Sequence, residues 1–189
     1  MLDRAILAAA ERQLQERGYS GMSMESVASA AGTTVPSVRR RYRDKSALAT
    51  AVIDSLRVVP IPEPTEDPRA DALAVLTNFQ RNLKRRHALV VLGSLLAEES
   101  RHPTLLDHFR ASLVQPRRAM LRQALTRGAS AGQLPVGLDL DAAVSMLIGS
   151  FYARYLSDGE IPDDWAERAL LAIWPSAVTV PARPARRGA

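Results

Sequence analysis

Apolar residues recur at spacings of three and four along most of the chain, which is the period of an amphipathic helix. Leu2, Ile6, Ala9 and Leu14 form the first stripe, and Gly18 should end that helix. The later stripes predict helices over residues 24–31, 36–42, 45–56, 69–86, 88–100, 104–128, 139–157 and 163–174. No stretch alternates apolar and polar residues as a half-buried strand would, so the pattern predicts an all-α fold.

Polar residues and prolines mark the expected ends of these helices. Ser23, Asp44, Asp139 and Asp163 stand where an N-cap side chain is needed. Four prolines lie between residues 60 and 68, and such a segment cannot be helical because proline lacks the N–H and clashes with the preceding turn. The sequence therefore predicts a linker between two helical parts.

A helix, a glycine, a short turn and a second helix follow one another between residues 24 and 42, which is the layout of a helix-turn-helix. Gly32 should stop the first helix, and either Thr33 or Thr34 should cap the second. In such motifs the N-terminal turns of the second helix read base edges in the major groove of DNA. The residues expected to face bases are Thr34, Val35, Pro36, Ser37 and Arg40.

Charge supports a nucleic-acid partner. The chain has 25 Lys and Arg against 20 Asp and Glu, a net charge of +5, and five of the basic residues fall between positions 39 and 45. Such a run can neutralise several phosphates, although a solvated helix face is an open alternative for any charge run. The residues expected to contact phosphates are Ser23, Thr33, Arg39, Arg41, Tyr42 and Lys45.

Other classes of site are disfavoured. The chain has no Cys, so disulfides, thiolate metal sites and Cys nucleophiles are excluded. His87, His102 and His108 lack the spacing that a helical zinc site favours, and no metal or cofactor is expected. The longest uncharged apolar runs are too short to span a membrane, and the N-terminus does not read as a secretory signal, so a cytoplasmic protein is expected.

The first fifty residues carry a specific pattern. From Ile6 to Leu48 it includes Ala9-Ala10, Gly18-Tyr19, Ser23-Met24, Val27-Ala28, Ala31-Gly32-Thr33-Thr34, Tyr42 and Lys45. This pattern resembles the N-terminal domain of the tetracycline-repressor (TetR) family of bacterial transcriptional regulators. The pattern departs from the family at Arg39, usually an aromatic residue, and at Arg41, often His or Tyr.

The resemblance implies that Lys45 holds a phosphate and that a helical C-terminal domain dimerises and often binds a small molecule. The expected division is a DNA-binding domain over 1–57, a Pro-rich linker over 58–68, a ligand-binding and dimerisation domain over 69–175 and a disordered basic tail over 176–189.

Two apolar stripes near the C-terminus are candidates for a dimer interface. The residues are Leu140, Val144, Leu147, Phe151, Tyr155, Trp165, Ala169 and Ile173. Two apolar helices at this place could simply complete the core of one chain. By the resemblance, they pack against a second copy as a four-helix bundle, and a homodimer is expected.

A ligand pocket is expected near Pro116, which falls inside a predicted helix. Proline there frees a carbonyl near Ser112 and bends the axis, which leaves room that a straight helix would fill. The candidate lining residues are Phe79, Leu83, His87, Phe109, Leu113, Pro116, Met120, Met146 and Phe151. The alternative is that these residues form ordinary core. Largely apolar walls suit a small hydrophobic or aromatic effector.

The expected function is sequence-specific regulation of transcription. A homodimer would bind a pseudo-palindromic operator in double-stranded DNA, act as a repressor and be released by a small hydrophobic ligand. Two alternatives stay open: an all-helical enzyme whose N-terminus only resembles a DNA reader, and a non-specific architectural DNA binder. The enzyme is disfavoured because the chain has no GxGxxG, P-loop, HExxH or GxSxG motif.

Overall fold

The structure is a computed structural model that describes residues 1–56, 60–84 and 88–174. Its elements are α1 (Leu2–Gly21), α2 (Met24–Ala30), α3 (Val35–Arg39), α4 (Lys45–Ser55), α5 (Pro68–Leu83), α6 (Ala88–Ala97), α7 (Pro103–Phe109), the π-helical turn η1 (Arg110–Val114), α8 (Gln115–Ser130), α9 (Leu140–Asp158) and α10 (Trp165–Ile173). The described residues contain no strand, and the all-α prediction is confirmed. The expected tail over 176–189 lies outside the described residues.

Most of the expected N-caps form. Ser23 accepts a hydrogen bond from the Ser26 amide at 3.1 Å, and Asp44 accepts one from the Ala47 amide at 2.8 Å. Asp139 likewise caps α9. The prediction for Asp163 is wrong, because α10 begins two residues later and the Asp163 carboxylate instead accepts from Lys84 Nζ at 2.6 Å.

The helix expected over 104–128 is three consecutive elements, α7, η1 and α8. The break in α-helical hydrogen bonding precedes Pro116, and the Gln115 amide reaches back five residues to the Arg110 carbonyl. A π-helical turn of this kind accommodates a position where the regular i to i−4 pattern is interrupted. The predicted disturbance is therefore present, but it falls in the turn before the proline.

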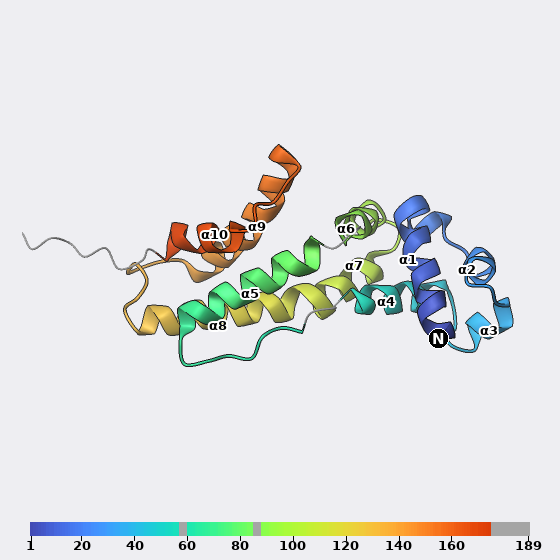
Figure 1. Cartoon of the computed structure of the whole chain (residues 1–189), viewed down its shortest axis with the longest axis horizontal. Coiled ribbons are helices and arrows are strands. Elements are labelled where there is room, and N and C mark those ends of the chain that lie inside the picture. The colour runs from blue at the N-terminus through green and yellow to red at the C-terminus, as the bar shows by residue number, and fades with distance from the viewer. Residues whose placement is uncertain (57–59, 85–87, 175–189) are drawn as a thin grey trace, which may run out of the picture.

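Two apolar cores lie along the elongated molecule (Figure 1). The first joins α1–α4 with α6, α7 and the end of η1, and buries Val91 and Leu106 against the N-terminal helices. The second joins α5, α8, α9 and α10 around aromatic rings, with Phe151 5.2 Å from both Phe79 and Trp165 between centroids. Helices that follow the proline-rich segment therefore complete the core of the N-terminal helices.

Burial corrects the choice of dimer residues at four positions. Leu147 is only 2% exposed in the single chain, and Val144, Phe151 and Trp165 are buried with it in the second core. Their stripe faces the interior because α9 must cover α8 and α10 in its own chain. A partner molecule cannot reach these four side chains, so any interface has to use other residues.

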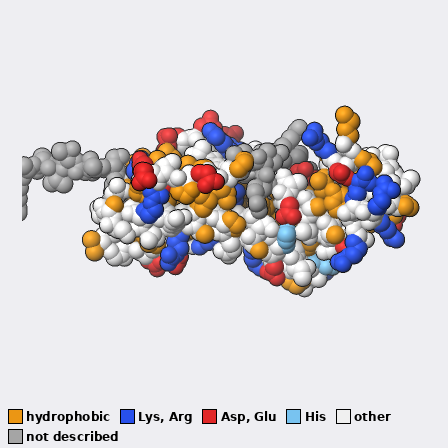
Figure 2. Space-filling model, turned by 90° about the horizontal axis from the view of Figure 1, so that it is seen from below, with side chains coloured by type: hydrophobic (Ala, Val, Ile, Leu, Met, Phe, Trp, Pro, Cys, Tyr) orange, Lys and Arg blue, Asp and Glu red, His pale blue; other side chains and the backbone are white. Residues whose placement is uncertain are grey.

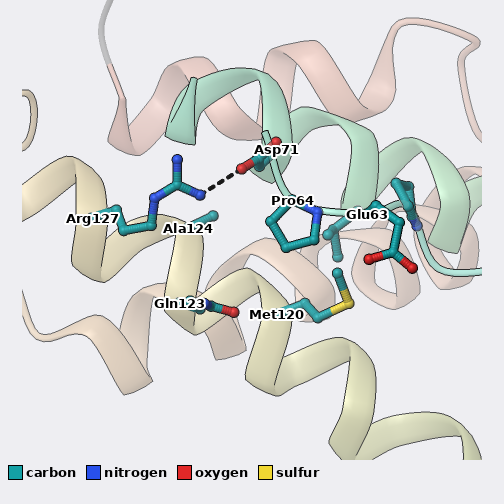
Figure 3. A pocket seen from close by; sticks show the side chains of 9 residues that line it. Glu63, Pro64, Asp71, Met120, Gln123, Ala124 and Arg127 are labelled. Carbon is teal, nitrogen blue, oxygen red and sulfur yellow. Dashed lines mark hydrogen bonds and ion pairs between the residues drawn. The ribbon is translucent and has the colours of Figure 1, made fainter. Parts of the chain in front are cut away.

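The proline-rich segment is tied down by a buried carboxylate. Asp71 in α5 is 8% exposed and accepts from the Thr65 amide at 2.9 Å, the Thr65 hydroxyl at 2.7 Å and Arg127 Nη1 at 2.7 Å. Burial alone raises the pKa of Asp71, but the hydrogen bonds from Thr65 and Arg127 outweigh it and hold the pKa below its ordinary value of 3.8. Figure 3 shows the Asp71–Arg127 pair beside Pro64.

Candidate DNA-binding interface and ligand cavity

The turn between α2 and α3 is closed by backbone hydrogen bonds that require glycine. Gly32 adopts φ +64°, a left-handed conformation that residues with a Cβ rarely take. The Thr33 amide then donates to the Ala28 carbonyl at 2.9 Å, which terminates α2 and reverses the chain. The sequence prediction that Gly32 stops this helix is confirmed.

Helix α3 buries one side chain completely and leaves the others half-buried or exposed. Thr34 is its N-cap and accepts from the Ser37 amide at 3.4 Å, which selects Thr34 over Thr33. Val38 is fully buried in the first core, whereas Thr34 and Pro36 are exposed and Val35 and Ser37 are half-buried. The first turn of α3 therefore lies at the surface at one end of the molecule (Figure 1).

The helix is shorter than predicted at its C-terminal end. It stops at Arg39, and Arg40 is its C-cap rather than an interior residue. The chain nevertheless keeps turning, since the Tyr42 amide donates to the Val38 carbonyl at 2.9 Å. Arg40 therefore stays within one turn of Ser37 on an exposed surface.

The basic residues divide into two groups. Arg39 and Arg40 are exposed and have no hydrogen bond or ion pair with a described residue. Arg41 instead pairs with Asp3 of α1 and donates to the Ser37 carbonyl at 3.1 Å. Figure 2 shows that Lys and Arg side chains gather at the end of the molecule formed by α1–α4.

Lys45 is also held by its own chain. Its Nζ donates to the Ser20 carbonyl at 3.2 Å and lies 4.4 Å from the centroid of the Tyr19 ring. Asp44, which caps α4 next to it, is a carboxylate whose pKa is lowered first by the Ala47 amide and then by Arg43. The start of α4 is thereby fixed against the end of α1.

Two family models cover most of the chain. Residues 6–52 match the model described as bacterial regulatory proteins, tetR family, and residues 62–173 match the tetracyclin repressor-like C-terminal domain. The chain belongs to the TetR family. It is therefore a DNA-binding transcriptional regulator, as the resemblance of its first fifty residues predicted. The family assignment indicates a regulator rather than an enzyme.

Two proteins named as HTH-type transcriptional regulators are similar to this chain over most of their length. The Bacillus subtilis (strain 168) HTH-type transcriptional regulator YdeS is 25% identical over 173 residues, which is 89% of this chain and 85% of that protein. The Mycobacterium bovis HTH-type transcriptional regulator Mb1581 is 28% identical over 167 residues, covering 88% of this chain and 82% of that protein.

Solved structures share the fold of this TetR-family chain. The repressor MexZ of Pseudomonas aeruginosa superposes with a TM-score of 0.72 at 24% identity, covering 90% of each chain. A linker-substituted form of the hemolysin II transcriptional regulator HlyIIR gives a TM-score of 0.74 at 18% identity, covering 93% of this chain and 96% of that one.

A cavity of about 130 Å³ lies where the two cores meet. Its described lining residues are Leu56, Phe79, Asn82, Leu83, Ala88, Phe109, Leu113, Val114, Arg117, Ile148 and Tyr152. Four of the residues predicted for a ligand pocket, Phe79, Leu83, Phe109 and Leu113, are therefore brought together. The turn η1 supplies two lining residues, so the break before Pro116 contributes to the cavity wall.

The other predicted pocket residues lie elsewhere. Met146 is 65% exposed on the outer face of α9, and Phe151 is buried in the second core. Met120 lines a separate hollow under the proline-rich segment (Figure 3), whose volume of about 10 Å³ holds about one water molecule. Pro116 is half-buried and does not line the cavity. His87 lies outside the described residues.

Arg117 was not predicted, although the sequence carried a signal for it. It stands four residues after Leu113 and four before Leu121, so it lies on the apolar stripe of its helix. The structure buries it to 9% exposure, and its Nη1 donates to the Leu113 carbonyl at 3.1 Å. An arginine in an apolar stripe can therefore indicate a buried guanidinium.

Within the described ranges, no group of three or more His, Asp or Glu is arranged to hold a metal ion. No described helix is long and apolar enough to cross a membrane.

Proposed function

We propose that the chain is a repressor that acts in the cytoplasm, binds a pseudo-palindromic DNA operator as a homodimer and is released by a small apolar molecule. The observation that carries the proposal is the exposed first turn of α3 next to Arg39 and Arg40. A short helix with small polar side chains at its N-terminus, flanked by unpaired cations, suits a major groove and its phosphates. The domain division predicted from the sequence is kept as part of this proposal.

Base reading is assigned to the exposed side of the first turns of α3, namely Thr34, Val35, Pro36, Ser37 and Arg40. Arg40 can approach a guanine in bidentate geometry because its guanidinium makes no hydrogen bond or ion pair within the described chain. Phosphate contacts are assigned to Ser23, Thr33, Arg39, Arg41, Tyr42 and Lys45. Of these, Arg41 has to exchange its pairing with Asp3 for a phosphate, so its contribution should be smaller than that of Arg39.

The dimer is assigned to the outward face of α9. Every residue from 153 to 160 is exposed, and the C-terminal part of α9 projects away from the other helices (Figure 1). Met146 and Leu156 are apolar and 65% and 83% exposed on this helix. Of the residues predicted from the sequence, Tyr155 is also exposed, because it continues the buried stripe into the part of α9 that extends beyond the second core. A two-fold contact between two copies would cover this surface.

The cavity suits the effector site because it touches both parts of the molecule. Leu56, the C-cap of α4, lines it together with residues of α5, α7, α8 and α9. Helix α4 begins at Lys45, beside the DNA-contacting surface. A molecule that fits the cavity better in one position of α4 than in another would change DNA affinity, and DNA would change the affinity for that molecule by the same factor.

DNA selection with the purified chain tests the proposal. The expected result is a two-fold motif whose half-sites lie about one helical turn, roughly 34 Å, or a multiple apart. Arg40→Ala should then lose discrimination at one position of each half-site, worth about 1–3 kcal/mol. Arg43→Ala is the matched control, since Arg43 is exposed but pairs with Asp44.

The exposed cations also favour a second candidate, a non-specific architectural DNA binder. Recovery of random sequences, with equal affinity for all of them, would support that candidate and contradict the repressor.

A further inference from the structure

We infer that the molecule bound in the cavity between α4, α5 and α7–α9 is a small apolar carboxylic acid, with Arg117 as the partner of its carboxylate. This inference rests on the proposed effector site and names the chemical class of its ligand.

The size of the cavity restricts the ligand. Its volume is about 130 Å³, whereas pockets for drug-sized molecules occupy roughly 300–1,000 Å³. A dry protein cavity of about 150 Å³ lined by aliphatic and aromatic residues binds benzene. The space here therefore suits one ring or a short branched chain, with little room for a further large group.

The walls of the cavity are apolar on most sides. Leu56, Phe79, Phe109 and Ile148 come from four different helices and turn carbon atoms toward the same space. Tyr152 adds a ring and a hydroxyl, and burial raises the pKa of that hydroxyl, so it is neutral at physiological pH. The polar side chains of the lining are Asn82, Tyr152 and Arg117, so a sugar would leave most of its hydroxyl groups without partners against the apolar remainder of the walls.

The charge in the wall is positive. Arg117 is 9% exposed, its guanidinium lies 5.5 Å from the centroid of the Phe79 ring, and a guanidinium keeps its proton in proteins. No described lining residue is an acid.

A small apolar carboxylic acid fits both the apolar walls and the positive charge of this cavity. The planar fork of a guanidinium matches the two oxygens of a carboxylate, and the attraction between opposite charges is stronger among apolar walls than in water. An ammonium group of the same size would meet a like charge there. A neutral amide keeps the shape and the hydrogen bonds of the acid but not its charge.

The test compares matched ligands on the wild-type chain by isothermal titration. Benzoate should bind at least tenfold more tightly than benzamide, a difference of about 1.4 kcal/mol, and benzylamine should bind more weakly than either. Cyclohexanecarboxylate and its amide form a second pair that separates a preference for the aromatic ring from the preference for the charge.

Variants locate the charge. Arg117→Gln should reduce the benzoate preference to less than threefold, and Arg117→Lys should keep part of it. Ala88→Phe, which fills the cavity without changing its charge, should weaken both ligands together. Thermal unfolding of each variant shows whether it is folded. If Arg117→Gln does not fold, the acid and amide pairs measured on the wild type test the carboxylate preference.

Equal affinity for the acid and the amide, or no binding of either acid at millimolar concentration, overturns the inference. DNA selection on the same preparation separates this failure from that of the proposed function. An operator without a carboxylate preference removes only the ligand class, whereas the absence of any operator removes the repressor whatever the titrations give.

Discussion

Gly128→Ala should destabilise the chain, although helix propensity alone predicts the opposite. Gly128 lies inside α8 and has no left-handed φ, so replacement by Ala should gain about 1 kcal/mol of helix stability. A Cβ at this position, however, would lie 2.5 Å from Trp174 Cζ2 and 3.1 Å from Cζ3, and closer still to Cη2. Trp174 is 2% exposed in the second core.

The size of the effect follows from these distances. Carbon atoms pack best at about 3.5–4.0 Å, so the Trp174 ring has to move by about 1 Å or more. Overpacking of a core typically costs about 1–3 kcal/mol, and complete loss of a buried Trp about 3–5 kcal/mol. After the gain in propensity, a net loss of about 2 kcal/mol is expected. In a chain of this length that lowers Tm by about 4–8 °C.

The assay is urea and thermal unfolding of the single and double variants. In a Trp174→Ala background the clash is gone, so Gly128→Ala should become neutral or stabilising, with a coupling of roughly 2–3 kcal/mol. Gly93→Ala in α6 is the matched control, because its Cβ would meet nothing within 4 Å and only the propensity gain applies. A Gly128→Ala chain more stable than wild type would refute the packing argument.

Three further results are expected. Asp71→Asn should cost about 2 kcal/mol in urea unfolding at pH 7, because a buried carboxylate that pairs with Arg127 is lost. Folding lowers the pKa of Asp71, so the difference in free energy of unfolding between the wild type and Asp71→Asn should be complete above the ordinary pKa of 3.8. The difference should shrink as pH falls through the lower folded-state pKa, and a difference that grows in acid would contradict this. Arg39→Ala and Lys45→Ala should each reduce the slope of log K for DNA against log salt by about 0.9, and unchanged slopes would remove them from the phosphate contacts. Met146→Glu should yield folded monomers in sedimentation, whereas Val136→Glu in an exposed loop should stay dimeric; a dimeric Met146→Glu chain would place the interface elsewhere.

The sequence by itself determined the local features of this protein. Helical spacing, the caps at Ser23 and Asp44 and the glycine at position 32 predicted the helix-turn-helix, because each depends on residues within one or two turns. The fold class followed from the helical spacing along the whole chain, and the family from its first fifty residues. The sequence also predicted that Thr34 through Ser37 lie at the start of α3.

Only the tertiary structure decided which face of each helix is buried and what each charge contacts. An apolar stripe shows that a face of α9 needs cover, but not whether α8 or a second molecule supplies it, and Leu147 proved to be core. Gly128 was expected to end its helix, yet it lies within α8, where Trp174 leaves no space for a side chain. The apolar stripe around Arg117 indicates burial but not that Arg117 lines a cavity, and nothing near Arg41 in the sequence indicates that it pairs with Asp3. These differences arise because such contacts join residues far apart in the chain, and local periodicity carries no information about them.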